Sequence, residues 1–401
     1  MGEVWDLVVV GAGPAGSAAA LAALRVRPGA RVLLLDRAAF PRDKPCGDGI
    51  APHALDVLAD LGLPGLVDDH RPVHRLHLAV DRGRAGPAVV GDMRRPARVV
   101  PRTVLDDRIR AGALAAGAVP GRGTVRAVQA GPDGVTLTVT GRELRARVVV
   151  AADGAGSAVR RSLGLAGPPR GHLALALRGY APVRADLADE QRIVFADDDR
   201  PAYAWSFPVG DGRANVGYGE LLRDDRPLTR ERLLRRLEDL LPGTTAGGTA
   251  WRGHHLPLSS AGARQPDGRV LLAGDALSLV NPMTGEGLYY AVLSGACAGA
   301  AAVAAPGAGA GAAHRRMLRR RLGAHLRLTG AVAGLTARLP GVVPAGVLAA
   351  ARHRSVFDDL VELGLGRGLL SVPTVLRVGG GLVRGGLVRG GLVRGGLAQP
   401  S

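Results

Sequence analysis

The sequence predicts an α/β fold with three parts: a discontinuous domain built on a parallel sheet, an antiparallel β domain, and a helical C-terminal region. Residues 4–36 have the pattern of strand, glycine turn, helix and strand that forms a βαβ unit. Two more buried strands, at 147–152 and 270–273, follow far along the chain, which makes the first domain discontinuous. Residues 170–256 are strand-like, and residues 314–370 have a basic helical pattern.

The connecting segments carry start and stop signals for further elements. Residues 73–100 alternate apolar with polar side chains and are expected to form strands. A Pro-Asp-Gly turn separates strands expected at 125–130 and 135–140, which indicates a hairpin. Helices are expected at 51–61, at 103–116 with Thr103 as the cap, at 229–241, and from about residue 285.

Length and composition limit the classes of protein. The 401 residues suit two domains or one domain with a large insertion, and 47% apolar content is too high for a disordered chain. With only Cys46 and Cys297, and no Cys/His cluster of zinc spacing, we expect no disulfide framework, no metal and a reducing, cytoplasmic setting. A net charge of +17 indicates an anionic partner surface, either nucleic acid or phospholipid.

We expect neither a signal peptide nor a membrane-spanning helix. Residues 1–23 begin with acidic side chains and lack a basic leader. Residues 291–313 are mostly Ala and Gly, and residues 329–351 are interrupted by Arg338 and two prolines. The expected protein is soluble, or peripheral on the inner face of a membrane.

The glycine turn after the first strand indicates a dinucleotide site. Gly11 permits the tight turn, Gly13 lets the backbone approach a pyrophosphate, and Gly16 lets the helix pack close to the strand. Asp36 ends the second strand, where it can accept from a ribose 2′-hydroxyl, which favours FAD or NAD over a nucleotide with a 2′-phosphate. A chance glycine turn is the alternative, but the strand, the helix and the terminal acid all agree with the nucleotide.

Two later strands favour FAD as that nucleotide. The strand at 147–152 runs into Asp153, and the strand at 270–273 runs into Asp275. Each carboxylate is flanked by glycine, so it can meet polyol hydroxyls without obstruction. The second leads through 281–287 into a helix whose N-terminus can stabilise an anionic reduced flavin by roughly 0.3–1 kcal/mol per contact. Ordinary Gly-Asp turns are the alternative.

With these elements the chain resembles the flavoprotein oxidoreductases of the p-hydroxybenzoate hydroxylase fold. Residues 41–50 (PRDKPCGDGI) are similar to the Cys-Gly loop of the geranylgeranyl reductase family, and residues 203–208 (YAWSFP) to its Tyr-x-Trp-x-Phe-Pro motif. The resemblance covers roughly residues 4–375, and Asp48 stands where the family often has glycine. It implies a Rossmann-type domain with non-covalent FAD, and reduction of isoprenoid C=C bonds by NAD(P)H in prenyl lipids, prenyl diphosphates or the menaquinone side chain.

The motifs and the resemblance together define the expected site. The expected catalytic residues are Cys46 and Gly47, and the expected substrate-binding residues are Tyr203, Trp205, Phe207 and Pro208. The expected cofactor-binding residues are Gly11, Gly13, Pro14, Ala15, Gly16, Asp36, Arg37, Cys46, Gly47, Arg102, Asp153, Gly154, Gly274, Asp275, Gly285, Gly287 and Leu288.

Cys46 has two interpretations from its own surroundings. It lies on a loop of prolines and glycines, where a structural cysteine is unusual, and Lys44 or Arg42 could lower its thiol pKa. A role in positioning or protonating the reacting carbons is one interpretation, and a small residue filling a tight turn is the other. No second acid can be named from the sequence.

The aromatic row and the basic helix also have two interpretations each. Tyr203, Trp205 and Phe207 lie on one face of a strand. They can form part of a sheet core or one wall of a pocket for a hydrophobic substrate. The arginines of 314–327 are either a solvated helix face or a docking face for anionic lipid. Nucleic acid is not expected, because no aromatics interleave with these arginines and no binding module is present.

The expected domain boundaries alternate along the chain. The FAD-binding domain is expected at 1–72, 101–165 and 265–313, the substrate domain at 73–100 and 166–264, the helical region at 314–378, and a flexible low-complexity tail with Leu-Val-Arg-Gly-Gly repeats at 379–401.

Two other functions are consistent with the same sequence features. One is flavin-dependent monooxygenation of an aromatic or polyketide substrate, and the other is a flavin-binding membrane module without catalysis.

Overall fold

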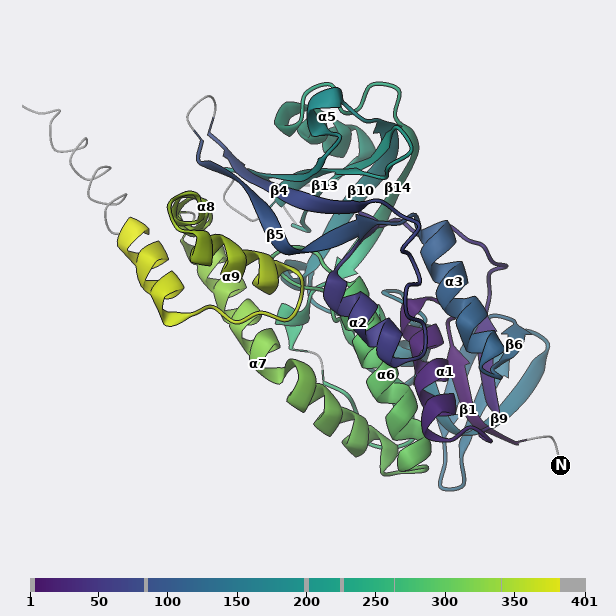
Figure 1. Ribbon diagram of the computed structural model, residues 1–401. Helices are drawn as coiled ribbons and strands as arrows, with labels where there is room; N and C mark the ends of the chain where they lie inside the picture. Colours follow the sequence, from purple (N-terminus) through teal and green to yellow (C-terminus); the bar gives the residue numbers. More distant parts are fainter. Residues whose placement is uncertain are drawn as a thin grey trace, which may run out of the picture.

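The computed structural model has two sheets, helices packed against both, and a C-terminal group of helices (Figure 1). This arrangement confirms the α/β fold expected from the sequence. The structure describes residues 4–82, 86–197, 202–223, 227–262, 264–339 and 341–382.

The first sheet has seven strands in the order β6-β2-β1-β9-β8-β7, with β15 paired to β9. Five of them pair in parallel, whereas β7 and β8 form the expected hairpin. Leu7 in β1 lies opposite both Val32 and Val148, so the valine-rich runs of three strands meet at the centre of the sheet. The strands are β1 (Val4–Val10), β2 (Val32–Asp36), β6 (Val119–Arg122), β7 (Val125–Ala130), β8 (Val135–Val139), β9 (Arg142–Ala151) and β15 (Val270–Leu272).

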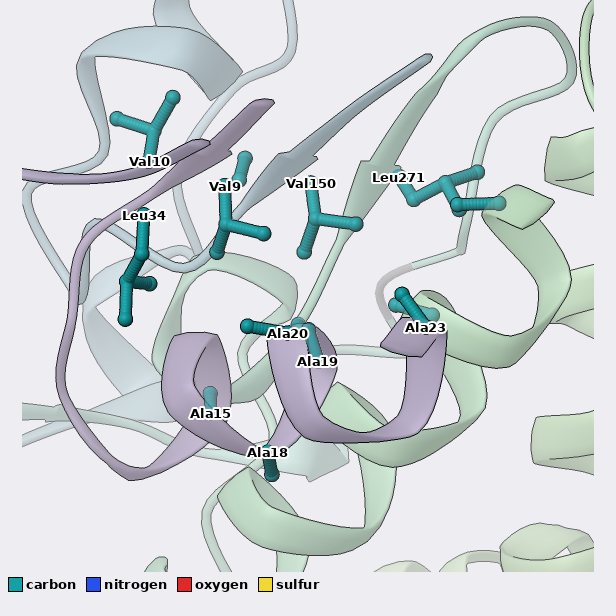
Figure 2. Close-up of a cluster of buried hydrophobic side chains, with 14 of the residues drawn as sticks. Val9, Val10, Ala15, Ala18, Ala19, Ala20, Ala23, Leu34, Val150 and Leu271 are labelled. Carbon is teal, nitrogen blue, oxygen red and sulfur yellow. The ribbon is translucent and has the colours of Figure 1, made fainter. Parts of the chain in front are cut away.

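Helices α1 (Pro14–Val26) and α6 (Leu288–Ala304) pack unusually close together beside this sheet. A Cβ atom at Gly295 would lie 2.0 Å from the carbonyl oxygen of Ala15, and one at Gly299 would lie 1.9 Å from that of Ala19. Figure 2 shows α1 lying against valine and leucine side chains of β1, β2, β9 and β15. The small residues of both helices therefore fix the N-terminus of α1 and the N-terminus of α6 at the carboxyl ends of the parallel strands.

The second sheet has eight strands in the order β14-β10-β13-β12-β11-β4-β5-β3. It is antiparallel as expected, except that β4 and β11 pair in parallel. Its strands are β3 (Gly49–Ile50), β4 (Pro72–Asp81), β5 (Ala88–Val99), β10 (Leu173–Pro182), β11 (Glu190–Ala196), β12 (Ala202–Pro208), β13 (Arg213–Leu221) and β14 (Thr249–Pro257). Helix α5 (Arg230–Leu240) covers one face of this sheet, and α8 (Val342–Arg352) and α9 (Arg354–Gly364) cover the other (Figure 1).

The remaining helices are α2 (Pro52–Asp60), α3 (Arg102–Ala115), α4 (Ala158–Ser162) and α7 (Ala310–Arg338). The expected cap at Thr103 is wrong, because α3 begins at Arg102 and Pro101 is its N-cap. Residues 372–382 are helical, so the first four residues of the expected tail lie in a helix, and the rest of the tail lies outside the described residues. Within the described residues no single helix is long and apolar enough to span a membrane, although α7 and α8 pass that test together as a pair bent by 115°.

Candidate active site

One cavity of about 1480 Å³ runs from the glycine turn, past the Cys-Gly loop and the second sheet, to the C-terminal helices. This volume exceeds the roughly 300–1,000 Å³ of a pocket for one small ligand. It is large enough for a dinucleotide together with a second ligand. All of the expected site residues line it except Gly16 and Pro208.

The glycine turn brings β1, α1 and β9 together at one end of the cavity. Gly11 has φ +99°, and a Cβ there would lie 2.3 Å from the carbonyl oxygen of Ala152, so no other residue fits. A Cβ at Gly16 would lie 1.7 Å from the carbonyl oxygen of Gly11, which makes Gly16 a packing residue behind the turn. Gly13, Pro14 and Ala15 at the start of α1 line the cavity, so a pyrophosphate can bind at this helix N-terminus.

Asp36 is held against this turn. Its Oδ2 accepts from the N–H of Ala12 at 2.7 Å, and its Oδ1 accepts from the N–H of Ala38 at 2.8 Å. The carboxylate lines the cavity beside Arg37. Asp36 therefore stabilises the turn itself, in addition to the ribose contact expected from the sequence.

The two Gly-Asp strand ends supply further polar groups. Asp153 accepts through Oδ2 from the N–H of Ala158 at 2.8 Å, whereas its buried Oδ1 has no hydrogen-bond partner among the described residues. Asp275 accepts from Lys44 Nζ at 2.9 Å, with His254 Nε2 at 3.6 Å. Burial opposes the charged form of Asp275, but Lys44 and His254 outweigh it and hold the pKa of that carboxyl well below its usual range.

These groups fit FAD. A flavin dinucleotide needs hydrogen-bond partners along its whole length. The cavity supplies a buried carboxylate oxygen without a partner among the described residues, a backbone turn that only glycine permits, and two helix N-termini. Gly11, Gly13 and Asp36 would hold the adenosine and pyrophosphate, and Asp153 and Asp275 would lie toward the ribityl chain and the ring.

The Cys46 thiol lies beside Arg102 and not beside the cations expected from the sequence. Lys44 pairs with Asp275, and Arg42 Nη1 lies 3.3 Å from Asp106 Oδ2. Burial raises the pKa of the Cys46 thiol, and the opposing charge of Arg102 does not cancel that effect. The expectation of a lowered thiol pKa is therefore wrong, and the thiol is a neutral group at neutral pH.

A buried amide that sequence reasoning missed fixes the Cys46 loop. Asn215 donates through Nδ2 to the carbonyl oxygen of Cys46 and to Oδ2 of Asp48, at 2.8 Å each. Its Oδ1 accepts from Trp205 Nε1 at 2.9 Å. One side chain thus joins the loop to the aromatic row. No local sequence pattern identifies Asn215, because its partners are distant in the chain.

Asp48 lies behind the loop and not in the cavity. Its φ of +60° lies in the left-handed region, which few residues other than glycine tolerate. Burial raises the pKa of Asp48 to about 6, although hydrogen bonds from the Tyr180 hydroxyl and Asn215 oppose the rise. Its Oδ1 has no partner among the described residues.

The aromatic row on β12 connects the two loops of the site. A Cβ at Gly47 would lie 3.4 Å from Cε2 of Phe207 and 3.5 Å from Nε1 of Trp205. At the other end of the row, the Tyr203 hydroxyl donates to the carbonyl oxygen of Thr284. All three aromatic side chains line the cavity. They are therefore placed as a wall for a ligand, with the Cys-Gly loop at one end and the 281–287 loop at the other.

A second acid lies on the 281–287 loop. Glu286 lines the cavity, and its Oε1 accepts from the N–H of Tyr289 at 2.8 Å. Burial raises the pKa of Glu286 to about 7, and the N–H groups of Tyr289 and Leu288 and the charge of Arg102 oppose the rise. Sequence reasoning treated Glu286 as part of a helix-start motif, so its place in the cavity was missed.

Beyond the aromatic row the cavity continues as an apolar corridor. Its walls include Leu76 and Met93 from the second sheet. Helices α7, α8 and α9 and the 372–382 helix supply Leu328, Val332, Val343, Val347, Leu360 and Val378. The corridor was not predicted, because the helices that form it are distant in sequence from every motif.

In the basic segment 314–327 the exposed side chains are those of Ala324 and of the arginines at 316, 319, 320, 321 and 327. Met317, Leu318 and Leu326 pack against the core of the first domain, and Leu322 is buried. Arg315 pairs with Asp267 at 2.6 Å. The apolar side of this segment is therefore not available to a membrane.

Comparison with known proteins gives consistent matches. Residues 5–296 match the family described as "FAD binding domain". A menaquinone reductase of Mycobacterium tuberculosis is 36% identical over 315 residues, covering 73% of this chain and 75% of that protein. Digeranylgeranylglycerophospholipid reductase 2 of Methanopyrus kandleri is 32% identical, covering 74% and 76%. A geranylgeranyl bacteriochlorophyll reductase-like protein of Thermoplasma acidophilum shares the fold, with a TM-score of 0.76, 20% identity, and coverage of 94% and 96%.

Proposed function

Because this chain belongs to the geranylgeranyl reductase family of FAD-binding oxidoreductases, we propose that it reduces C=C bonds of an isoprenoid chain with electrons from NAD(P)H. The isoprenoid chain of the substrate is part of a prenyl lipid, a prenyl diphosphate or menaquinone. The observation that carries the proposal is the single cavity, in which the FAD cradle, the Cys-Gly loop, the aromatic row and the apolar corridor are continuous. Such a cavity suits a long apolar chain that must reach a flavin.

The residues of the cavity perform distinct tasks in this reaction. When bound, FAD supplies hydride that it has taken from NAD(P)H. An isolated alkene is poorly polarised, so the protein must position it closely and exclude water. Trp205 and Phe207 pack against Gly47 and form one wall for the isoprenoid chain, and Asn215 fixes the loop that carries Cys46. Cys46 then contacts the reacting carbons as a neutral thiol.

Anaerobic stopped-flow absorbance tests this function. The enzyme is first reduced with NAD(P)H and then mixed with geranylgeranyl diphosphate, an unsaturated ether lipid or menaquinone. The flavin absorbance should return with at least one of these, and should stay bleached with the fully saturated analogue of the same substrate. If only oxygen restores the absorbance, with one oxygen atom added to an aromatic substrate, the chain is a monooxygenase instead.

We also propose that the enzyme takes its substrate from an anionic membrane through an apolar rim at the end of the corridor. We define this rim as Leu335, Leu339, Leu348, Leu369, Val372, Val375 and Leu376, all of which are exposed. Leu335 and Val375 also line the cavity, so the corridor meets the surface there. Exposed arginines at 338, 352 and 367 lie in the same segments, and each can add about 1 kcal/mol near anionic lipid.

A further inference from the structure

Reduction of an alkene needs a proton as well as a hydride, and the cavity offers a small set of donors. Tyr203 already donates to Thr284, and Asp275 is held as a carboxylate by Lys44 with His254 beside it. Burial raises the pKa of Cys46 above its ordinary value, which makes its thiol slow to give up a proton. The other acids on the described cavity walls are Asp36, Asp43, Asp153, Glu220 and Glu286. Asp36 and Asp153 belong to the proposed cofactor cradle, Asp43 is bonded to Arg178, and Glu220 is bonded to Tyr218 and Arg232. Glu286 lies on the loop that the Tyr203 hydroxyl contacts, and its carboxyl group accepts from a backbone N–H.

We propose that Glu286 is a catalytic residue that donates the proton to the alkene carbon opposite the one that receives hydride. This inference rests on the proposed function and names the acid that the reaction requires. The aromatic row supports it: Tyr203 contacts the 281–287 loop, and Phe207 contacts Gly47. An alkene held along that row lies between the carboxyl group of Glu286 and the Cys46 loop.

The loop that carries Glu286 is rigidly held. The N–H of Asn281 donates to the carbonyl oxygen of Glu286 at 2.8 Å, and the N–H of Gly285 donates back to Asn281 at 2.9 Å. The side chain of Asn281 is anchored to the carbonyl oxygen of Leu363 at 3.1 Å. The carboxyl group accepts from the N–H of Tyr289, in the first turn of the 17-residue helix α6. Backbone N–H groups there stabilise the carboxylate that remains after proton transfer.

The charges around Glu286 suit an acid at neutral pH. The groups that face it are Arg102 from α3, Cys46 from its loop, Tyr203 from β12 and Tyr290 from α6. Arg102 is the single cation among these, and its guanidinium is already bonded to Asp106. Glu286 therefore holds its proton up to a pH of about 7 and can release it when the adjacent carbon accepts it.

The step balances without a further reactant. Hydride from the reduced cofactor forms a C–H bond at one alkene carbon, with the two electrons that NAD(P)H supplied. The π pair of the alkene forms the second C–H bond with the proton of Glu286, and the O–H pair stays on the carboxylate. After the product leaves, a proton from bulk solvent returns to Glu286, so each turnover adds two hydrogens to the isoprenoid chain.

The test is Glu286→Gln, which keeps the size of the side chain and its bond from Tyr289 but cannot donate an acid proton. Flavin content and flavin reduction by NAD(P)H should be unchanged. Single-turnover alkene reduction by the pre-reduced enzyme should fall about 10²-fold or more. In the wild type this rate should decline as pH rises through about 7, and the decline should vanish in Glu286→Gln. Glu362→Gln is the control, because Glu362 bonds His53 outside the cavity.

Two further measurements test the proposal, and the first of them does not depend on turnover. The infrared spectrum of the oxidised holoenzyme should contain a carboxylic-acid band that titrates near pH 7 and is absent in Glu286→Gln, whereas the band of Asp48, with a pKa of about 6, should remain in both proteins. Glu286→Asp should reduce the alkene slowly but keep a pH-dependent decline. Wild-type rate and pH profile in Glu286→Gln would overturn the inference and leave the proposed function intact. A wild type that reduces its flavin but no isoprenoid alkene would refute the proposed function, and this inference with it.

Discussion

Asp48→Asn should change how the stability of this protein depends on pH. Burial raises the pKa of Asp48 from an ordinary 3.8 to about 6. Between these values the folded protein binds more protons than the unfolded chain, so Asp48 makes the protein less stable as pH rises through this window. A shift of this size corresponds to about 3 kcal/mol, fully expressed above about pH 6. Asparagine removes this contribution, and it tolerates the left-handed backbone at this position.

Urea unfolding of the FAD-saturated proteins measures the effect. The asparagine variant places an amide where Asp48 Oδ1 has no partner among the described residues, which costs about 1–3 kcal/mol at every pH. The informative quantity is therefore the difference in unfolding free energy between variant and wild type. It should move in favour of the variant by about 3 kcal/mol from below pH 3.8 to pH 7.5, with about half of the change above pH 5. Parallel pH dependences for the two proteins would refute a buried, destabilised carboxylate at this position.

Three other changes test the cofactor cradle, the thiol and the apolar rim. Gly13→Val should release FAD, since a side chain enters the space of the pyrophosphate, and full flavin absorbance in the purified variant would count against the assignment. Cys46→Ser should keep flavin binding and reduction but lower alkene reduction about 10²-fold in stopped-flow assays, because the smaller, more polar hydroxyl no longer positions the reacting carbons; a wild-type rate would make Cys46 a turn residue. The triple change Leu369→Ser, Val372→Ser and Leu376→Ser should weaken sedimentation with anionic vesicles and lower activity on embedded substrate, while sparing a short substrate dispersed in detergent.

A matched control separates the rim from general surface effects. Val26→Ser and Val119→Ser change two exposed apolar residues on the first domain, away from the C-terminal helices, and should not alter vesicle binding. Replacing the exposed arginines 316, 319 and 320 by Gln tests the alternative docking face on α7. If only the arginine variant loses vesicle binding, the basic helix and not the apolar rim contacts the membrane.

The sequence was most informative where function depends on local backbone. The βαβ unit, its glycines and the two Gly-Asp strand ends could be located because each role needs particular residue types at fixed spacing. Asn215 and Glu286 could not be assigned in this way. Asn215 meets Cys46 only through the folded second sheet, and Glu286 enters the cavity only because α6 is fixed against α1.

The error over Cys46 has the same physical cause. Lys44 and Arg42 are near it in sequence, but the folded loop directs both cations to carboxylates on other elements. Arg102 and Asp48, which do affect the thiol, oppose each other, and burial then decides the direction of the pKa shift. The apolar corridor could not be foreseen either, because helices more than a hundred residues from the aromatic row complete it.

Mass analysis of the product tests whether this protein reduces isoprenoid C=C bonds. Enzyme reduced anaerobically with NAD(P)H is mixed with a prenylated substrate, and the extracted lipid is compared with the same lipid incubated with Gly13→Val protein. The proposed reaction adds two hydrogens per reduced double bond, located in the isoprenoid chain, with no added oxygen. An unchanged isoprenoid chain, or a gain of one oxygen atom that requires air, would contradict it.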